Sequence, residues 1–144
     1  MAEIAVEACK ALTPEMFVAV SSLIRALSTS ARSPSWEEIN EVVTSPATTL
    51  LLARDGSEVI GMLTLILVQI PTGLRGHIED VVVAESHRKK GVGEALSKHA
   101  LAIAQTKGAR TVDLTSRPSR EAANRLYQRL GFKLRDTCVY RYTL

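Results

Sequence analysis

The stretch VVVAESHRKKGVGEAL, residues 81–96, decides the fold because its character changes twice. It opens with valines that favour a strand, passes through a basic loop, and continues with apolar residues at helical spacing. The loop ends in Gly91 and Gly93, and glycine lets a bound group approach the backbone without a Cβ in the way. A helix start adds unpaired N–H groups and a partial positive charge. These features together predict an anion site, most simply a phosphate cradle.

The composition is that of a globular protein, and we expect one domain over residues 1–144. Apolar residues make up 46% and charged residues 23% of the chain. A net charge of +3 suits an anionic ligand but falls short of the dense basic face of a nucleic-acid-binding protein. No apolar run is long enough for a bilayer, and the first ten residues do not resemble a signal peptide. Cys9 and Cys138 lack the spacing of metal ligands or a disulfide framework. We therefore expect free thiols, a cytoplasmic protein, and no metal, nucleic-acid or membrane partner.

Residue patterns along the chain predict an α/β fold with a mixed sheet and helices on both faces. Asp55-Gly56 between two β-rich runs predicts a tight hairpin, and Gly108 predicts a left-handed helix end. The later strand–helix–strand part must be parallel and right-handed if its strands share the sheet. The predicted elements are a strand at 4–8, helices at 14–27 and 34–43, strands at 48–54, 57–68 and 77–84, a helix at 91–106, a strand at 111–115, a helix at 120–130, and strands at 132–134 and 139–144.

Two other phosphate-binding motifs fit the loop less well. A P-loop requires a Lys followed by Ser or Thr after its glycines, and neither glycine here is followed by that pair. A dinucleotide-binding motif needs a third glycine where Leu96 stands. Asp113 lies at about the distance of the ribose-binding acid of that motif, but in mid-strand. On this segment alone, a solvated basic loop that precedes a helix stays open as an alternative.

The stretch resembles the V-x-V-x(4)-R-x-x-G-x-G signature of the GCN5-related N-acetyltransferase (GNAT) superfamily. The sequence RLYQRLGF at residues 125–132 resembles the second signature of that family, and the predicted element order fits its fold along nearly the whole chain. The resemblance implies that strands at 80–83 and 111–115 splay apart. It also implies acetyl-CoA as co-substrate and acetyl transfer to a primary amine by direct transfer in a ternary complex. A homodimer is a further implication of the family.

The resemblance assigns the CoA contacts to three places. The pantetheine arm would lie along Val81, Val82 and Val83. The helix at 120–130 would contribute Arg120 and Asn124, although many members carry an Asn where Arg120 stands, so a solvated helix start is the competing interpretation. The pyrophosphate would lie on the loop and helix start, formed by Arg88, Lys89, Lys90, Gly91, Val92, Gly93 and Glu94.

Acetyl transfer to an amine needs few catalytic groups. The amine must lose a proton to a base, and the oxyanion and the leaving thiolate both need a donor. A backbone N–H near Val81 or Val82 could donate to the oxyanion. Tyr127 matches the tyrosine of the family and is the candidate acid. The alternative is a tyrosine packed at a helix end with its hydroxyl merely satisfied.

Two carboxylates precede the valines and are candidates for handling the amine. Regular alternation puts Glu79 on the face shared with Val81 and Val83, and Asp80 on the other face. We expect Glu79 to be the general base and Asp80 to contact the substrate, with His77 as a weaker candidate base. A solvated charge at a strand end is the alternative for both carboxylates.

The amine acceptor is left open by the sequence. In this fold it is selected by the segment at 28–36 and by the turn at 135–137. The sequence IEDVVV at 78–83 resembles glucosamine-6-phosphate N-acetyltransferases within the superfamily, so an amino sugar phosphate is one expectation beside a protein or peptide amine. Two other classes compete: a non-catalytic acyl-CoA sensor, and a nucleotide-binding regulatory module that would prefer NAD or ATP.

Overall fold

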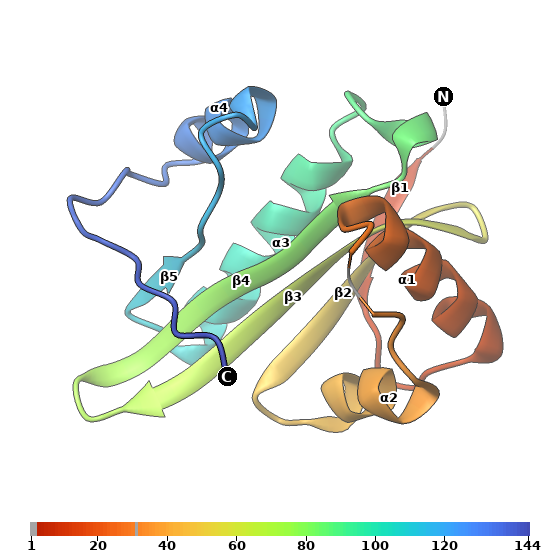
Figure 1. The fold of residues 1–144 in the computed structure, drawn as a ribbon, viewed down its shortest axis with the longest axis horizontal. Helices are drawn as coiled ribbons and strands as arrows, with labels where there is room; N and C mark the ends of the chain where they lie inside the picture. The colour runs from red at the N-terminus through yellow and green to blue at the C-terminus, as the bar shows by residue number, and fades with distance from the viewer. Residues whose placement is uncertain (1–2, 31) are drawn as a thin grey trace. The chain divides into compact units, whose positions relative to one another are not determined.

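Five strands form one sheet, and each strand lies beside its neighbour in the sequence. The computed structural model, which describes residues 3–30 and 32–144, shows helices on both faces of this sheet (Figure 1). The chain divides into two compact units, residues 1–114 with the sheet and residues 115–144 with the last helix. In order, the elements are β1 (Ile4–Ala8), α1 (Pro14–Leu27), α2 (Trp36–Thr44), β2 (Thr48–Asp55), β3 (Glu58–Ile70), β4 (Gly73–Val83), the short 3₁₀ helix η1 (Glu85–His87), α3 (Val92–Lys107), β5 (Thr111–Asp113) and α4 (Glu121–Arg129).

The first four strands are antiparallel neighbours, and α3 carries the chain over to β5, which is parallel to β4. The predicted hairpin at Asp55-Gly56 is confirmed: Asp55 pairs with Glu58, and Gly56 has a φ of 60°, in the left-handed region that glycine tolerates. The predicted mixed sheet is therefore correct, and its elements follow the predicted order as far as α4.

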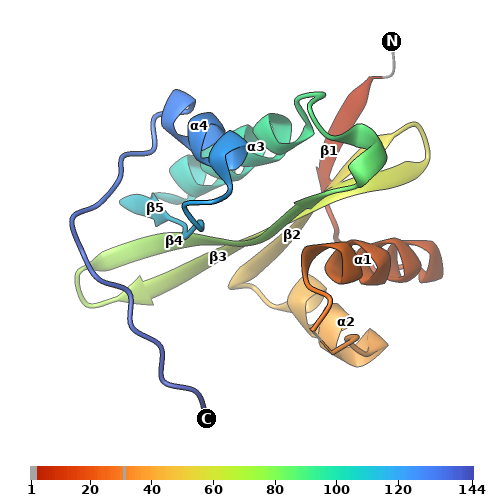
Figure 2. The same ribbon diagram turned by 45° about the horizontal axis from the view of Figure 1, so that its top comes forward.

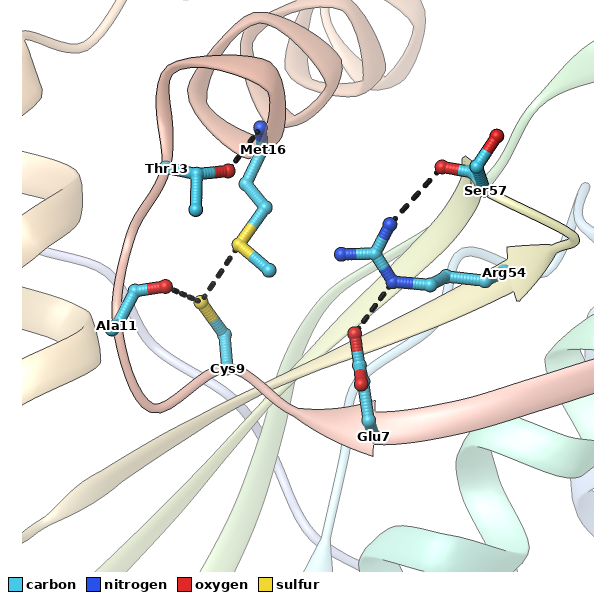
Figure 3. Close-up of polar contacts among 7 residues, drawn as sticks. All are labelled: Glu7, Cys9, Ala11, Thr13, Met16, Arg54 and Ser57. Atoms are coloured by element: carbon cyan, nitrogen blue, oxygen red, sulfur yellow. Dashed lines mark hydrogen bonds and ion pairs between the residues drawn. The ribbon is translucent and has the colours of Figure 1, made fainter.

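Side-chain contacts join the end of β1 to α1 and to β2 (Figure 3). The Thr13 hydroxyl accepts from the N–H of Met16 at 3.2 Å and caps α1, as a Thr before Pro14 predicts. The thiol of Cys9 lies 3.7 Å from the Met16 sulfur, and burial raises the pKa of this thiol. Across the sheet, Arg54 of β2 pairs with Glu7. The Cys9 contact joins the end of β1 to the first turn of α1, and the Arg54 ion pair joins β1 to β2.

The sheet separates two apolar layers, with α1 and α2 against one face and α3 against the other (Figure 2). Alternate residues of β2 serve the two layers, and both Leu51 and Leu52 are fully buried. Burial of each such side chain contributes about 1.5–3 kcal/mol. The layer beneath α1 and α2 consists of Cys9, Val20, Leu23, Ile39, Leu50, Leu52, Met62 and Val82.

Glycines bound α3 at both ends. Gly91 precedes the helix with a φ of 81°, and Gly108 ends it with a φ of 85°. The N–H of Gly108 bonds to the carbonyl of Gln105, and the N–H of Ala109 bonds to that of Ala104. The predicted left-handed cap at Gly108 is confirmed, and its bonds satisfy carbonyls at the helix end.

The two predicted final strands are wrong. Residues 132–144 form neither helix nor strand. Alternating apolar residues favour an extended chain, but a strand exists only where another strand takes its N–H and C=O groups. None of the five strands of the sheet pairs with this segment within the described part of the chain. Beyond Phe132, its large apolar side chains are exposed, from 76% for Val139 to 111% for Leu144, and include Leu134, Tyr140 and Tyr142.

We predict that Gly61→Val destabilises the protein by about 1–3 kcal/mol, because overpacking a close contact forces its neighbours apart. A Cβ at Gly61 would lie 3.0 Å from Val92 and 3.3 Å from Leu96 of α3. Urea unfolding measures the change in free energy. Gly56→Asn is the control, because nothing lies within 4 Å of a Cβ there and Asn tolerates a positive φ. Equal losses in both variants would show that the close approach of β3 to α3 is not the cause.

Candidate functional site

β4 loses its β5 partner halfway along its length. The two strands pair at Arg75–Thr111, Gly76–Val112 and His77–Asp113, where β5 ends. β4 continues to Val83, so its residues 78–83 have no strand partner on the β5 side within the described part of the chain. The predicted splay of these strands is confirmed, and it exposes main-chain donors and acceptors to which an extended ligand can bind.

A β-bulge interrupts β4 within this unpaired stretch. Glu79 stands opposite Thr64 and Val82 opposite Met62, so two residues of β4 face one residue of β3. The two residues are Asp80 and Val81, and Asp80 has a φ of 52°. A bulge leaves its extra residue outside the ladder and redirects the neighbouring side chains. The backbone N–H of Val81, one of the predicted oxyanion donors, therefore belongs to the bulge.

The bulge also corrects the predicted orientation of Glu79. The partners of Glu79 and Val82 lie two positions apart on β3, so these two residues share a face of the sheet. Val82 belongs to the apolar layer beneath α1 and α2, and Glu79 therefore lies on the α1–α2 face. Regular alternation instead put Glu79 with Val81 and Val83. That expectation is wrong because one extra residue reverses the alternation. The sequence carries only a faint trace of the bulge, an Asp at a left-handed position.

His77 and Glu79 form a pair on this face. The Nε2 atom of His77 lies 2.9 Å from a carboxylate oxygen of Glu79, and both side chains are partly exposed. An ionised carboxylate only accepts hydrogen bonds, so Nε2 is the donor. Asp80 follows directly, and burial, together with the charge of Glu79, raises the pKa of the Asp80 carboxyl. Three groups able to bind or deprotonate an amine thus lie within four residues of the bulge.

The loop after β4 turns sharply before α3. After η1, Lys89 has a φ of 63° and Gly91 one of 81°, two left-handed positions that turn the chain into α3. Lys89 and Lys90 are exposed, whereas the Arg88 Nε donates to the carbonyl of Val83 at 3.3 Å. The loop therefore presents two exposed ammonium groups beside its own backbone.

The start of α3 has no side-chain cap. The N–H of Ala95 is the donor that reaches the carbonyl of Gly91, at 3.0 Å, so the N–H groups of Val92 and Gly93 precede the first helical hydrogen bond. A Cβ at Gly91 would meet nothing within 4 Å, so space is open there. Open space, N–H groups at a helix start and adjacent lysines fit an anion such as a pyrophosphate.

The second unit holds the candidate acid. Tyr127 is the buried residue of α4, and its ring contacts that of Phe132 edge-on at 5.7 Å. Burial raises the pKa of Tyr127, and the charge of Arg120 lowers it by less, so the phenol stays protonated at neutral pH. The side-chain amide of Asn124 donates to the carbonyl of Arg117 at 3.0 Å. That bond gives Asn124 a structural role at the helix start.

The structure brings the predicted residues together in two groups. Residues 77–83 and 85–94 form one continuous run of strand, bulge, loop and helix start. Tyr127, Arg120 and Asn124 lie together in the second unit. The segment at 28–36, expected to select the acceptor, contains residue 31, which lies outside the described residues. At its end, Trp36 packs against Phe17 with ring centroids 5.6 Å apart.

Comparison with known proteins assigns the family. The sequence matches the acetyltransferase (GNAT) family over residues 15–132. It is 34% identical over 73 residues to N-alpha-acetyltransferase 30 of Schizosaccharomyces pombe, a match that covers 51% of this chain and 48% of that protein. It is 38% identical over 69 residues to the N-alpha-acetyltransferase of Sulfurisphaera tokodaii, which covers 46% of this chain and 41% of the relative.

The fold agrees with solved structures as well. The aminoglycoside N-acetyltransferase AAC(6')-Iy, solved in complex with CoA, superposes with a TM-score of 0.83 at 14% identity, over 99% of this chain and 96% of the other. At that identity the likeness concerns the fold. The family match covers most of the sequence, and this chain belongs to the GNAT family of acetyltransferases.

The described residues hold neither a membrane-spanning helix nor a metal-binding cluster. No helix within residues 3–30 and 32–144 has the length and apolar character needed to cross a membrane. The same residues hold no group of three or more His, Cys, Asp or Glu side chains arranged to bind a metal ion.

We predict that Asp80→Asn raises the free energy of unfolding at neutral pH. The folded-state pKa of Asp80 lies above its ordinary value of 3.8, so the ionised carboxylate destabilises the folded state once the pH exceeds that pKa. The advantage of the variant should shrink as pH falls toward 3.8, where the folded and unfolded states both become protonated. Urea unfolding of both proteins across this range measures the difference.

Glu79→Gln is the matched variant for this prediction. It removes the smaller cause of the shift, the like charge beside Asp80, and should stabilise in the same direction by less. An advantage of Asp80→Asn that stays constant with pH would contradict the titration argument. A constant advantage would point to the backbone conformation at that position instead.

Proposed function

We propose that this protein transfers an acetyl group from acetyl-CoA to a primary amine by direct transfer in a ternary complex. The observation that carries the proposal is the continuous run from the open edge of β4, through its bulge, to the uncapped start of α3. It provides main-chain groups for an extended thiol arm and an anion site at its end. Membership of the GNAT family supports acetyl-CoA as the donor, and we propose one domain over residues 1–144.

The donor would be held mainly by backbone. Val81, Val82 and Val83 lie at the unpaired edge and suit the amide groups of a pantetheine arm. The lysines of the loop and the N–H groups of Val92 and Gly93 suit the pyrophosphate. Arg120 would add a charge-assisted contact to a CoA phosphate. We retain Asn124 as a weaker contact, because its amide already holds the start of α4.

The transfer requires two proton movements. The Glu79 carboxylate, directly or through a water, accepts the proton of the attacking amine, and His77 holds the carboxylate in place by donating from Nε2. A backbone N–H at the bulge stabilises the oxyanion. As the new C–N bond forms and the C–S bond breaks, Tyr127 donates its proton to the thiolate. Asp80 attracts the cationic form of the amine before it is deprotonated.

The relatives favour a peptide α-amine as acceptor. Both are named N-alpha-acetyltransferases and are more than 30% identical to this chain over the matched segments. The structural neighbour is named for an aminoglycoside acceptor but is much less similar in sequence. We therefore propose the N-terminal amine of a peptide first and an amino sugar phosphate second.

Ligand-dependent thermal unfolding tests the donor. A ligand that binds only the folded protein raises the unfolding temperature, so acetyl-CoA and CoA should raise it, whereas NAD and ATP should not. A shift with NAD or ATP alone would favour a nucleotide-binding module. The absence of a shift with either CoA species would overturn the proposed donor. A shift without turnover of any amine in a panel of peptides and amino sugars would favour the acyl-CoA sensor.

We predict that Glu79→Gln and Tyr127→Phe each lower kcat by about 100-fold or more, because each removes one proton transfer. Turnover of the best acceptor, measured with saturating acetyl-CoA, gives the change. Glu41→Gln on α2 is the matched control, since that exposed carboxylate lies far along the sequence from β4. A Tyr127→Phe variant with normal kcat would assign Tyr127 to packing.

We further propose a cytoplasmic homodimer. The two cysteines are free, Cys9 buried and Cys138 exposed, as suits a reducing compartment. Exposed Tyr140, Tyr142 and Leu144 lie at alternate positions of one segment and suit an interface. Light scattering coupled to gel filtration should give twice the chain mass, and Tyr140→Ser with Tyr142→Ser should give the monomer. A monomeric wild-type protein at micromolar concentration would refute this assignment.

A further inference from the structure

His87 is the last residue of η1, and it makes a contact that the sequence does not foretell. Its Nε2 atom lies 2.9 Å from a carboxylate oxygen of Asp55, 32 positions earlier in the chain. Only 13% of the His87 side chain and 29% of the Asp55 side chain are exposed, so water competes less here than at the His77–Glu79 pair. Arg88 follows directly and is the first residue of the loop at 88–91 that leads into α3, here called the anion loop.

The hydrogen bonds determine the tautomer of His87. An ionised Asp55 only accepts, so Nε2 carries the proton that is donated to it. The other ring atom, Nδ1, lies 2.8 Å from the hydroxyl of Ser86. In the neutral ring, Nδ1 accepts from that hydroxyl. Both ring nitrogens are therefore engaged, and the ring is held at two points.

Asp55 is held in place by strand pairing on both of its sides. It ends β2, where it pairs with Ile4 of β1 and with Glu58 of β3. The adjoining part of β2 is buried, with Leu51 and Leu52 at 0% exposure. The His87 contact thus joins the loop to the end of β2, a strand that is paired on both of its edges.

The loop itself is short of internal support. Lys89 holds a φ of 63°, which costs a residue with a side chain about 1 kcal/mol or more. The start of α3 has no side-chain cap. Two backbone bonds hold η1, from His87 to Ala84 and from Arg88 to Glu85, and the Arg88 side chain adds a bond to the carbonyl of Val83 at 3.3 Å. A further contact to another strand of the sheet therefore helps to select the conformation of this loop.

We propose that His87 and Asp55 are positioning residues, forming a clamp that holds the anion loop in the conformation that binds the pyrophosphate of CoA. The clamp touches neither the ligand nor the reacting atoms. It acts by keeping the N–H groups of Val92 and Gly93 and the charges of Lys89 and Lys90 in one arrangement before the ligand arrives. Preorganisation of this kind raises affinity because less ordering remains for the binding step. The proposal rests on CoA being the ligand of this loop.

The test compares two ligands that share the thiol arm, of which only CoA carries the pyrophosphate and the phosphoadenosine attached to it. CoA and pantetheine, which lacks the pyrophosphate, are titrated into the ¹⁵N-labelled full chain, and NMR shifts give both Kd values even when binding is weak. His87→Ala should weaken CoA binding by about tenfold, the effect of one lost hydrogen bond to a charged group, and leave pantetheine unchanged. His87→Gln retains an amide donor at the place of Nε2 and should restore most of the affinity.

Two further variants separate the clamp from general damage. Asp55→Ala should cause the same loss as His87→Ala, and the double variant should lose no more than either one, because both remove a single contact. His99→Ala, which removes the third histidine from the middle of α3, should bind both ligands normally.

Each outcome decides a different question. Equal weakening of CoA and pantetheine by His87→Ala would overturn the clamp in favour of a general structural role. Unchanged CoA binding by His87→Ala, or additive losses in the double variant, would also overturn it. Wild-type protein that binds pantetheine and CoA equally would instead overturn the pyrophosphate site in the proposed function.

Discussion

β4 is paired very differently along its two edges, and the candidate site depends on that difference. Its β3 edge is paired from Gly73 to Val83, interrupted by the bulge, and so belongs to a sheet with a buried core. Its β5 edge is paired at three positions only. An unpaired edge is normally a liability, because its N–H and C=O groups can recruit another chain. Here pairing with β3 fixes the conformation of β4, so the edge without a β5 partner keeps a defined shape at the candidate site.

Local chemistry made much of the fold predictable. The Asp55-Gly56 turn, the Thr13 cap of α1 and the glycines around α3 each depend on residues close together in the sequence. The exposed segment at 132–144 shows the limit of such reasoning. Its alternating residues report a preference for extended chain, whereas a strand also needs a partner that no local pattern specifies.

The sequence predicted where the loop before α3 lies in the fold, but not the geometry of the candidate site. The loop that precedes α3 was located from its glycines and charges, and Glu79 from its place before the valines. The face on which Glu79 lies depends on the register of β4 against β3, which the sequence of β4 alone does not contain. The contact of His87 with Asp55 joins residues 32 positions apart and could not be predicted from the sequence either. Both features depend on how two separate segments of the chain come together, which the residues of one segment do not specify.

The order of the sheet also bears on how the chain folds. Each strand pairs with its neighbour in the sequence, so β2, β3 and β4 can pair through contacts between residues that are close in the sequence. Such contacts favour fast folding and can form while the chain is being synthesised. β5 must wait for α3 to cross over the sheet. We therefore expect the open edge of β4 to be framed late, after the apolar surfaces of β2 and β3 are already covered. In an intermediate that lacks β5, the apolar residues of β2 and β3 would already be buried, which limits aggregation during synthesis.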